Sequence, residues 1–190
     1  MSAARTTIGQ CFVMVSRYLS RRDFLKMSAG GVVVASTLPS VSWASRADEP
    51  RVLAMNNLNT GELLESCYFD GSNYVDKELK RLDNFCRDHR RNEVHPMDRR
   101  LFDQISQIQK LIGTENEVIV ISGYRSPATN SSLRNSSSGV AKKSMHMEGK
   151  AIDFRLDGVK LSKVRDAALS LKAGGVGYYP RSNFVHIDTG

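Results

Sequence analysis

Cysteine and tryptophan are scarce in this 190-residue chain, which has three cysteines and one tryptophan. Cys11 and Trp43 lie near the N-terminus, which leaves only Cys67 and Cys86 in the rest of the chain. Two cysteines are too few for a zinc site built from four thiolates. In an oxidising compartment they form a disulfide, or else Cys86 is a small apolar residue buried on a helical face. The sequence leaves both alternatives open.

Long hydrophobic runs are also missing. A mildly apolar stretch, residues 27–38, is rich in small residues and is shorter than the about 20 strongly apolar residues that span a bilayer. Arg21 and Arg22 precede this stretch, and Ser42-Trp43-Ala44 follows it with small residues at both positions that specify a cleavage site. This order of segments is typical of an export signal, and it resembles a twin-arginine (Tat) leader.

We therefore expect residues 1–44 to be a cleaved signal peptide and residues 45–190 to be one domain. Met14 is a second candidate for the translation start. The partner that this signal implies is the Tat export machinery, and the compartment is the periplasm. We expect contact with the membrane only through the signal peptide.

Positive charge is concentrated at the N-terminus. The chain has 27 basic and 20 acidic residues, a net charge of +7. Five of the basic residues and one of the acidic residues lie within residues 1–44, so about +4 belongs to the predicted signal and about +3 to the domain. The domain has no basic run interleaved with aromatic residues, which argues against nucleic acid as a partner.

Apolar periodicity outlines the secondary structure. Helical spacing predicts helices over residues 75–91 and 98–112, with Gly113 at a C-terminal cap. The long segment 126–138, rich in serine and asparagine, is predicted to be a loop. The predicted strands are residues 51–56, 62–69, 118–121, 151–156, 176–179 and 184–188, and a third helix is predicted over residues 161–172. This order predicts an α+β fold, with a small antiparallel sheet packed on helices.

Two of the four histidines stand out. His89 and His95 lie in polar segments and are expected to be solvated. His146 precedes Asp153 by seven residues across a glycine turn, and His186 lies on another predicted strand. Two histidines and one aspartate make a three-ligand zinc set with an open fourth position. Spacing alone leaves open the alternative that these histidines are structural.

The surrounding motifs resemble a known family. The pattern Ser144-x-His146-x-x-Gly149-x-Ala151-x-Asp153, the upstream Ser122-Gly123-Tyr124-Arg125-Ser126 and the downstream His186 resemble the M15-type zinc D,D-peptidases of bacterial cell walls, which share the Hedgehog/DD-peptidase fold. Three further stretches resemble the murein endopeptidase K branch of this group: residues 57–62, 139–144 and 173–180. The resemblance covers residues 51–190.

The resemblance implies a role for each motif residue. His146, Asp153 and His186 would hold a Zn²⁺ ion, and Arg125 would direct its guanidinium at the carbonyl oxygen of the cleaved bond. Such a pair polarises the carbonyl and stabilises the developing oxyanion. Ser144 would hydrogen-bond to a ligand or order its turn. The alternative for Arg125 is an exposed turn residue.

One position departs from the family pattern. Many of these peptidases have an acidic general base three residues before the last histidine ligand, where this chain has Asn183. Asp188 lies two residues after His186 and projects to the same face of a strand, so it is the first candidate for the base. Glu148 is the second candidate. The alternatives are that Asp188 hydrogen-bonds to a histidine and that Glu148 is exposed.

Motifs of other cell-wall enzymes are absent. The sequence has no Ser-x-x-Lys and no Gly-x-Ser-x-Gly motif, and Cys67 lacks the context of an L,D-transpeptidase nucleophile. The predicted function is therefore an exported zinc metallopeptidase that hydrolyses peptide cross-links of peptidoglycan containing diaminopimelate. The alternatives are a non-catalytic wall-binding domain of the same fold and a D-alanyl carboxypeptidase.

Overall fold

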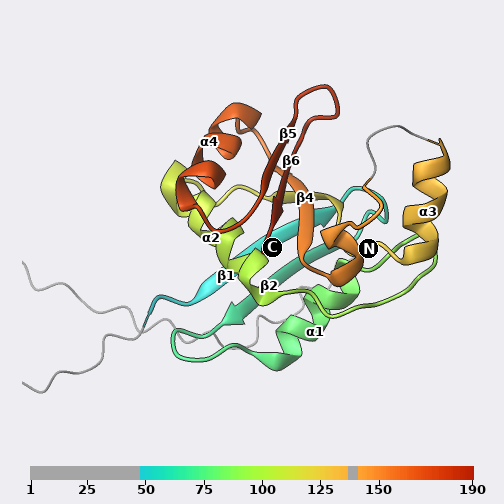
Figure 1. The fold of residues 1–190 in the computed structure, drawn as a ribbon. Coiled ribbons are helices and arrows are strands. Elements are labelled where there is room, and N and C mark those ends of the chain that lie inside the picture. Colours follow the sequence, from blue (N-terminus) through green and yellow to red (C-terminus); the bar gives the residue numbers. More distant parts are fainter. Residues whose placement is uncertain (1–47, 137–140) are drawn as a thin grey trace, which may run out of the picture. The chain divides into compact units, whose positions relative to one another are not determined.

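The computed structural model describes residues 48–136 and 141–190; the predicted signal peptide, residues 1–44, lies outside these ranges. The elements follow the order β1 (Arg51–Asn57), β2 (Leu63–Phe69), α1 (Asp76–Phe85), α2 (Arg99–Ile112), β3 (Val118–Ser122), α3 (Pro127–Ser136), the 3₁₀ turn η2 (Met145–Glu148), β4 (Ala151–Leu156), α4 (Leu161–Leu171), β5 (Val176–Tyr179) and β6 (Phe184–Asp188) (Figure 1). Within the described ranges, no helix combines the length and apolarity needed to cross a membrane.

The strands form one six-stranded sheet in the order β2-β1-β3-β4-β6-β5. Among the described strands β1 pairs with β3 in parallel, and the other pairs are antiparallel. The α+β prediction and the predicted strands are confirmed, but the expectation of a wholly antiparallel sheet is wrong. The reason is the long connection from β2 to β3, because α1 and α2 return the chain in the direction of β1.

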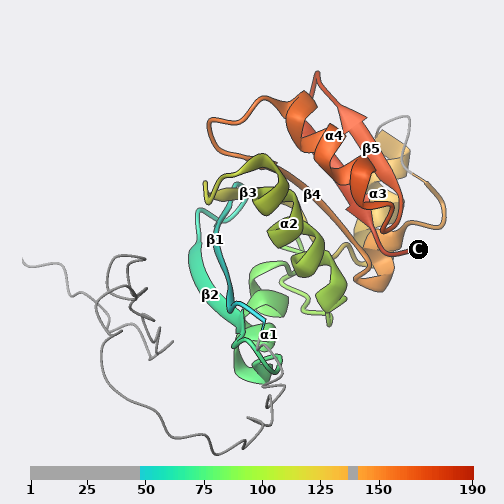
Figure 2. The same cartoon turned by 90° about the vertical axis from the view of Figure 1, so that its left-hand side faces the viewer.

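The two faces of the sheet have different roles. On β4 and β6 one face carries apolar side chains, such as Ile152 and Ile187, that are fully buried. Helix α4 contacts β4, β5 and β6 and packs against α2 (Figure 2). Because side chains alternate along a strand, the opposite face carries Asp153 and His186, which the register places directly across from each other. The core therefore fixes the strands that present these polar residues.

Helix α2 has the boundaries that the sequence predicts. The Asp98 carboxylate accepts a hydrogen bond from the backbone N–H of Arg100, and Gly113 ends the helix in the left-handed conformation. The other carboxylate oxygen of Asp98 accepts a hydrogen bond from the Thr189 hydroxyl at 2.9 Å. The cap therefore also fastens the residue after β6 to the start of α2.

Helix α1 is shorter than predicted, ending at Phe85 rather than near residue 91. The cause is Asp88, which is buried and accepts hydrogen bonds from the backbone N–H groups of Arg90 and Ser126. Aspartate competes with helical geometry by bonding to nearby backbone groups in this way. The contact with Ser126 also ties this turn to the segment after β3.

Residues 127–136 form a helix, so the prediction of a long loop over 126–138 is wrong where the structure describes it. The hydroxyl of Ser126 accepts a hydrogen bond from the Thr129 N–H, and Pro127 occupies the first helical turn. Serine at the cap followed by proline is a known helix start. The serine- and asparagine-rich composition obscured that signal. Figure 1 shows α3 well separated from α4, beyond β4.

Cys86 remains a buried thiol, so the alternative of a disulfide with Cys67 is wrong. Burial raises the pKa of the Cys86 thiol to about 12. Its role as a small apolar core residue is confirmed.

Candidate metal centre

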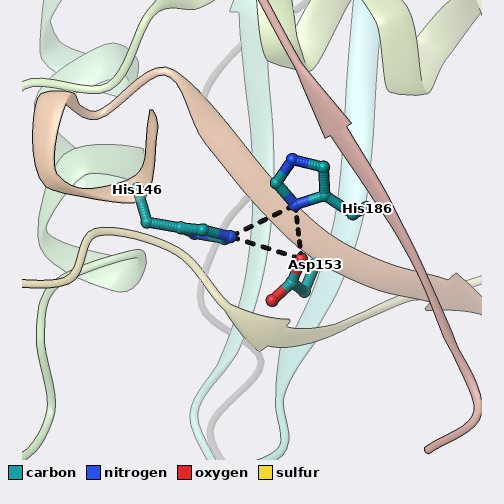
Figure 3. A group of neighbouring side chains, drawn as sticks. All are labelled: His146, Asp153 and His186. Carbon is teal, nitrogen blue, oxygen red and sulfur yellow. Dashed lines mark hydrogen bonds and ion pairs between the residues drawn. The ribbon is translucent and has the colours of Figure 1, made fainter. Parts of the chain in front are cut away.

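Three donor side chains converge on the polar face of the sheet (Figure 3). His146 comes from η2, Asp153 from β4 and His186 from β6. The His186 Nδ1 atom lies 2.8 Å from Asp153 Oδ1 and 3.2 Å from His146 Nε2, and His146 Nε2 lies 3.3 Å from the same carboxylate oxygen. Within the described residues, these form the one group of three or more such side chains with metal-binding spacing.

The His146 ring is oriented by a backbone carbonyl. Its Nδ1 atom lies 2.8 Å from the carbonyl oxygen of Gly123, which only accepts hydrogen bonds, so Nδ1 carries the hydrogen. The Nε2 atom thereby faces Asp153 and His186. The η2 turn ends at Gly149 with φ = 65°, and a Cβ atom there would lie 2.2 Å from the Pro96 carbonyl oxygen. Gly149 therefore allows the η2 turn to lie close against the Pro96 carbonyl oxygen.

The His186 ring is oriented by Asp188. The Oδ2 atom of Asp188 lies 3.4 Å from His186 Nε2, on the side of the ring away from the donor group. Its Oδ1 atom accepts hydrogen bonds from the backbone N–H groups of Gly175 at 2.7 Å and Gly190 at 3.2 Å. Both carboxylate oxygens of Asp188 are therefore engaged, and His186 is left with Nδ1 facing Asp153.

The electrostatics of the group favour a bound cation. Burial alone would raise the pKa of Asp153, but hydrogen bonds and charge from His146 and His186 outweigh it and lower that pKa to about 2. Burial alone would lower the pKa of His186, but the carboxylates of Asp153 and Asp188 raise it above its ordinary value. The carboxylates of Asp153 and Asp188 therefore favour positive charge at this position.

The donors fit zinc. Two imidazole nitrogens and one carboxylate oxygen are typical ligands of a catalytic zinc site with an open fourth position. In each histidine the ring nitrogen opposite the donor group is bonded to an acceptor, Gly123 for His146 and Asp188 for His186, as is usual for metal-bound histidine.

Zinc affinity is expected to depend on pH. Because the pKa of His186 is raised, a zinc ion bound here would displace a proton, so affinity should fall about tenfold per pH unit once the pH drops below that pKa. Asp153 adds no dependence above about pH 4, because its pKa is about 2. Competition with a chelator between about pH 5.5 and 8 measures the slope. An affinity that stays constant over this range would contradict the expectation.

Arg125 lies beside the donor group. Its Nη2 atom is 3.8 Å from Asp153 Oδ2 and donates a hydrogen bond to the Ser122 hydroxyl at 3.3 Å. The side chain is only 15% exposed, and burial lowers the pKa of its guanidinium. The Nε–H is buried without a hydrogen-bond partner in the described part of the chain. An unsatisfied buried donor costs stability unless a ligand accepts from it, so this is not the setting of an exposed turn residue.

The remaining predicted residues lie outside the donor group. Ser144 precedes η2, where its backbone carbonyl accepts a hydrogen bond from Met147, and its side chain makes no capping hydrogen bond. Glu148 is exposed and paired with Lys150 at 2.8 Å. Asn183 is exposed in the β5–β6 turn with φ = 54°. The carboxylate of Glu148 is thus engaged by a lysine.

Several contacts that build the site were not predicted from the sequence. The Arg125 N–H donates to the carbonyl of His146 at 3.1 Å, which joins the segment after β3 to η2. His95, expected to be solvated, is half-buried and stacks on Tyr124 with ring centroids 4.6 Å apart. The motif around Arg125 gives only a partial sequence signal for its bond to His146. No local sequence pattern predicts the stacking of His95 on Tyr124.

A His–Asp–His donor set beside a half-buried arginine, on a mixed α+β sheet, fits the class of metal-dependent hydrolases. A family model described as "Peptidoglycan L,D-endopeptidase MepK" matches residues 45–190. The chain belongs to this family.

Individual relatives agree with the family match. The chain is 51% identical over 173 residues to the peptidoglycan L,D-endopeptidase MepK of Escherichia coli K12, covering 90% of this chain and 94% of the relative. It is 48% identical over 176 residues to a probable peptidoglycan L,D-endopeptidase MepK of Haemophilus influenzae, with 91% and 95% covered. The predicted murein endopeptidase K branch is thereby confirmed.

Proposed function

We propose that this chain is an exported zinc peptidase that hydrolyses L,D cross-links in peptidoglycan. The observation that carries the proposal is the convergence of His146, Asp153 and His186 within 4.8 Å, with the half-buried Arg125 beside them. The family match and the names of relatives at 51% and 48% identity support this substrate.

In this mechanism His146, Asp153 and His186 hold the ion. Zinc, when bound, polarises a carbonyl oxygen and lowers the pKa of its water ligand towards about 7, where little help from a basic side chain is needed. Arg125 donates hydrogen bonds to the carbonyl oxygen of the cleaved peptide bond and stabilises the charge that develops on it. Its burial strengthens this interaction, since fewer water molecules compete.

For Asp188 we infer a positioning role instead of the role of general base. Its carboxylate lies on the Nε2 side of the His186 ring, and the donor group lies on the Nδ1 side. From there it fixes the hydrogen on Nε2 and leaves Nδ1 available as a ligand. The anchoring bonds from Gly175 and Gly190 hold it in this place and also lower its pKa against the opposing effect of burial.

Replacement of Asp188 by asparagine tests this role. The amide can present N–H groups to His186 Nε2, which favours the tautomer with the hydrogen on Nδ1 and opposes metal binding. Zinc affinity should fall about 10- to 100-fold, while kcat at saturating zinc falls little. A general base would give the opposite pattern, with unchanged zinc affinity and a kcat lower by about 10²- to 10⁴-fold. Chelator competition and zinc-saturated kinetics separate the two.

Export to the periplasm, through residues 1–44 and by the Tat route, is part of the proposal. The paired Arg21 and Arg22 and the cleavage pattern at Ser42-Trp43-Ala44 support it. Fractionation of cells that produce the chain, compared with an R21K/R22K double variant, tests the route. The N-terminal sequence of the exported protein tests the cleavage site.

Digestion of purified peptidoglycan tests the activity. The zinc-loaded chain is incubated with L,D- and D,D-cross-linked muropeptide dimers, and products are identified by mass. Monomers released from the L,D-linked dimer support the proposal. Free D-alanine alone would identify a carboxypeptidase, and binding to sacculi without any product would identify a wall-binding domain. The His146→Ala variant, treated identically, controls for contaminating hydrolases.

A further inference from the structure

Two aromatic rings lie on the same face of the sheet as the metal centre. In the β5–β6 hairpin Tyr179 pairs with Phe184 and Gly177 pairs with His186. Directly opposed residues share a face, and so do residues two apart on one strand. Tyr179 and Phe184 therefore lie on the face of His186. Their rings stack with centroids 4.6 Å apart and planes 22° apart.

Gly177 lets the Tyr179 ring lie towards His186. A Cβ atom at Gly177 would be 2.7 Å from Cε2 of Tyr179 and 3.1 Å from Cβ of His186. The first distance is a clash, and the second is a tight contact. The phenol ring of Tyr179 thus occupies the space above Gly177. The gap between this ring and the His186 side chain has the size of the methyl group that glycine lacks.

Tyr179 is open to solvent in this position, with 48% of its surface exposed. Its hydroxyl makes no side-chain hydrogen bond within the described residues and is available to a ligand. The neighbouring Tyr178 is different, because it points to the other face, where the Arg165 guanidinium lies 4.6 Å from its ring centroid. Figure 1 shows the hairpin projecting from the rest of the domain. A large exposed ring, held by a second ring beside a metal centre, is suited to contact a bound substrate.

We propose that Tyr179, supported by Phe184, is a substrate-binding wall of the metal centre. The ring packs against aliphatic parts of the peptide stem next to the cleaved bond, and the hydroxyl hydrogen-bonds to a peptide group of that stem. This inference rests on the proposed function, because it assigns the residue to the substrate of the same site. The wall limits how the cross-link lies across the donor group, so its loss raises KM more than it lowers kcat.

Kinetics of three variants on an L,D-cross-linked muropeptide dimer test the inference. Tyr179→Ala should raise KM about tenfold or more, and Tyr179→Phe should raise it about three- to tenfold through loss of the hydroxyl. Tyr178→Ala, which removes a ring of similar exposure from the other face, is the matched control and should leave KM within about twofold of wild type. Zinc content and circular dichroism are measured for each variant.

The outcomes are distinguishable. Unchanged KM in Tyr179→Ala, with an active wild type, overturns this inference and leaves the proposed function intact. An equal rise of KM in Tyr178→Ala also overturns this inference. A loss of activity in Tyr179→Ala that follows a loss of zinc does the same, since either result indicates a purely structural role. A wild-type chain that binds zinc but releases no product overturns the proposed function, and this inference with it.

Discussion

Alanine in place of His146 is expected to abolish zinc binding and to lower the rate of cross-link hydrolysis by on the order of 10³-fold or more. The residue supplies one of only three donors in the group, and its ring is already oriented by the Gly123 carbonyl. Loss of a metal that contributes several kcal/mol of transition-state stabilisation accounts for a factor of this size. Metal analysis of the purified variant and release of soluble muropeptides measure the two effects.

Two comparisons sharpen this test. Wild type stripped by a chelator should lose activity and regain it with added zinc, whereas the His146→Ala variant should not respond. His89→Ala is the matched control, because His89 is half-buried and outside the donor group. Full activity in metal-free wild type, or zinc retained by His146→Ala with normal turnover, would show that the group is not the catalytic centre.

Arg125→Ala is expected to lower kcat by about 10²- to 10³-fold while zinc remains bound. The guanidinium is not among the metal ligands, but its Nη2 atom lies 3.8 Å from Asp153 and its Nε–H lacks a partner in the described residues. Its removal should therefore take away the donor that we propose for the substrate carbonyl without dismantling the donor group. Steady-state kinetics and zinc content, measured on the same preparation, test the prediction.

Lysine at position 125 separates charge from geometry. A lysine keeps the positive charge but loses the planar set of N–H donors, so Arg125→Lys should recover only part of the activity. Arg134→Ala is the matched control, since Arg134 is an exposed arginine on α3, and its kcat should match wild type. A kcat unaffected in Arg125→Ala would remove this residue from the mechanism.

Much of the centre was predictable because its ligands lie in short, regular patterns. Spacing already singles out His146, Asp153 and His186 as a three-ligand set, and the resemblance then favours a metal site over a structural role for the two histidines. The boundaries of α2 were predictable for the same reason, because Asp98 and Gly113 are caps that act within one turn.

The parts that were missed depend on contacts between distant segments. Helix α1 ends early because Asp88 bonds to Ser126, 38 residues away, and the same serine begins α3. The parallel pairing of β1 with β3 likewise depends on how the intervening helices pack. The place of Asp188 on the face of His186 was predicted, but its anchoring bonds from the backbone N–H groups of Gly175 and Gly190 were not, since they carry no side-chain signal.

The donors of the metal centre also constrain when the ion can be acquired. His146 and His186 are brought together only after β6 pairs with β4 and the Gly123 carbonyl meets the η2 turn. An unfolded chain therefore offers scattered ligands in place of a site, and the ion binds the native state selectively. By thermodynamic linkage, each tenfold rise in free zinc above its dissociation constant adds about 1.4 kcal/mol to the free energy of unfolding. In the proposed zinc enzyme, the same bonds that orient His146 and His186 thus couple the stability of the domain to the zinc supply of its surroundings.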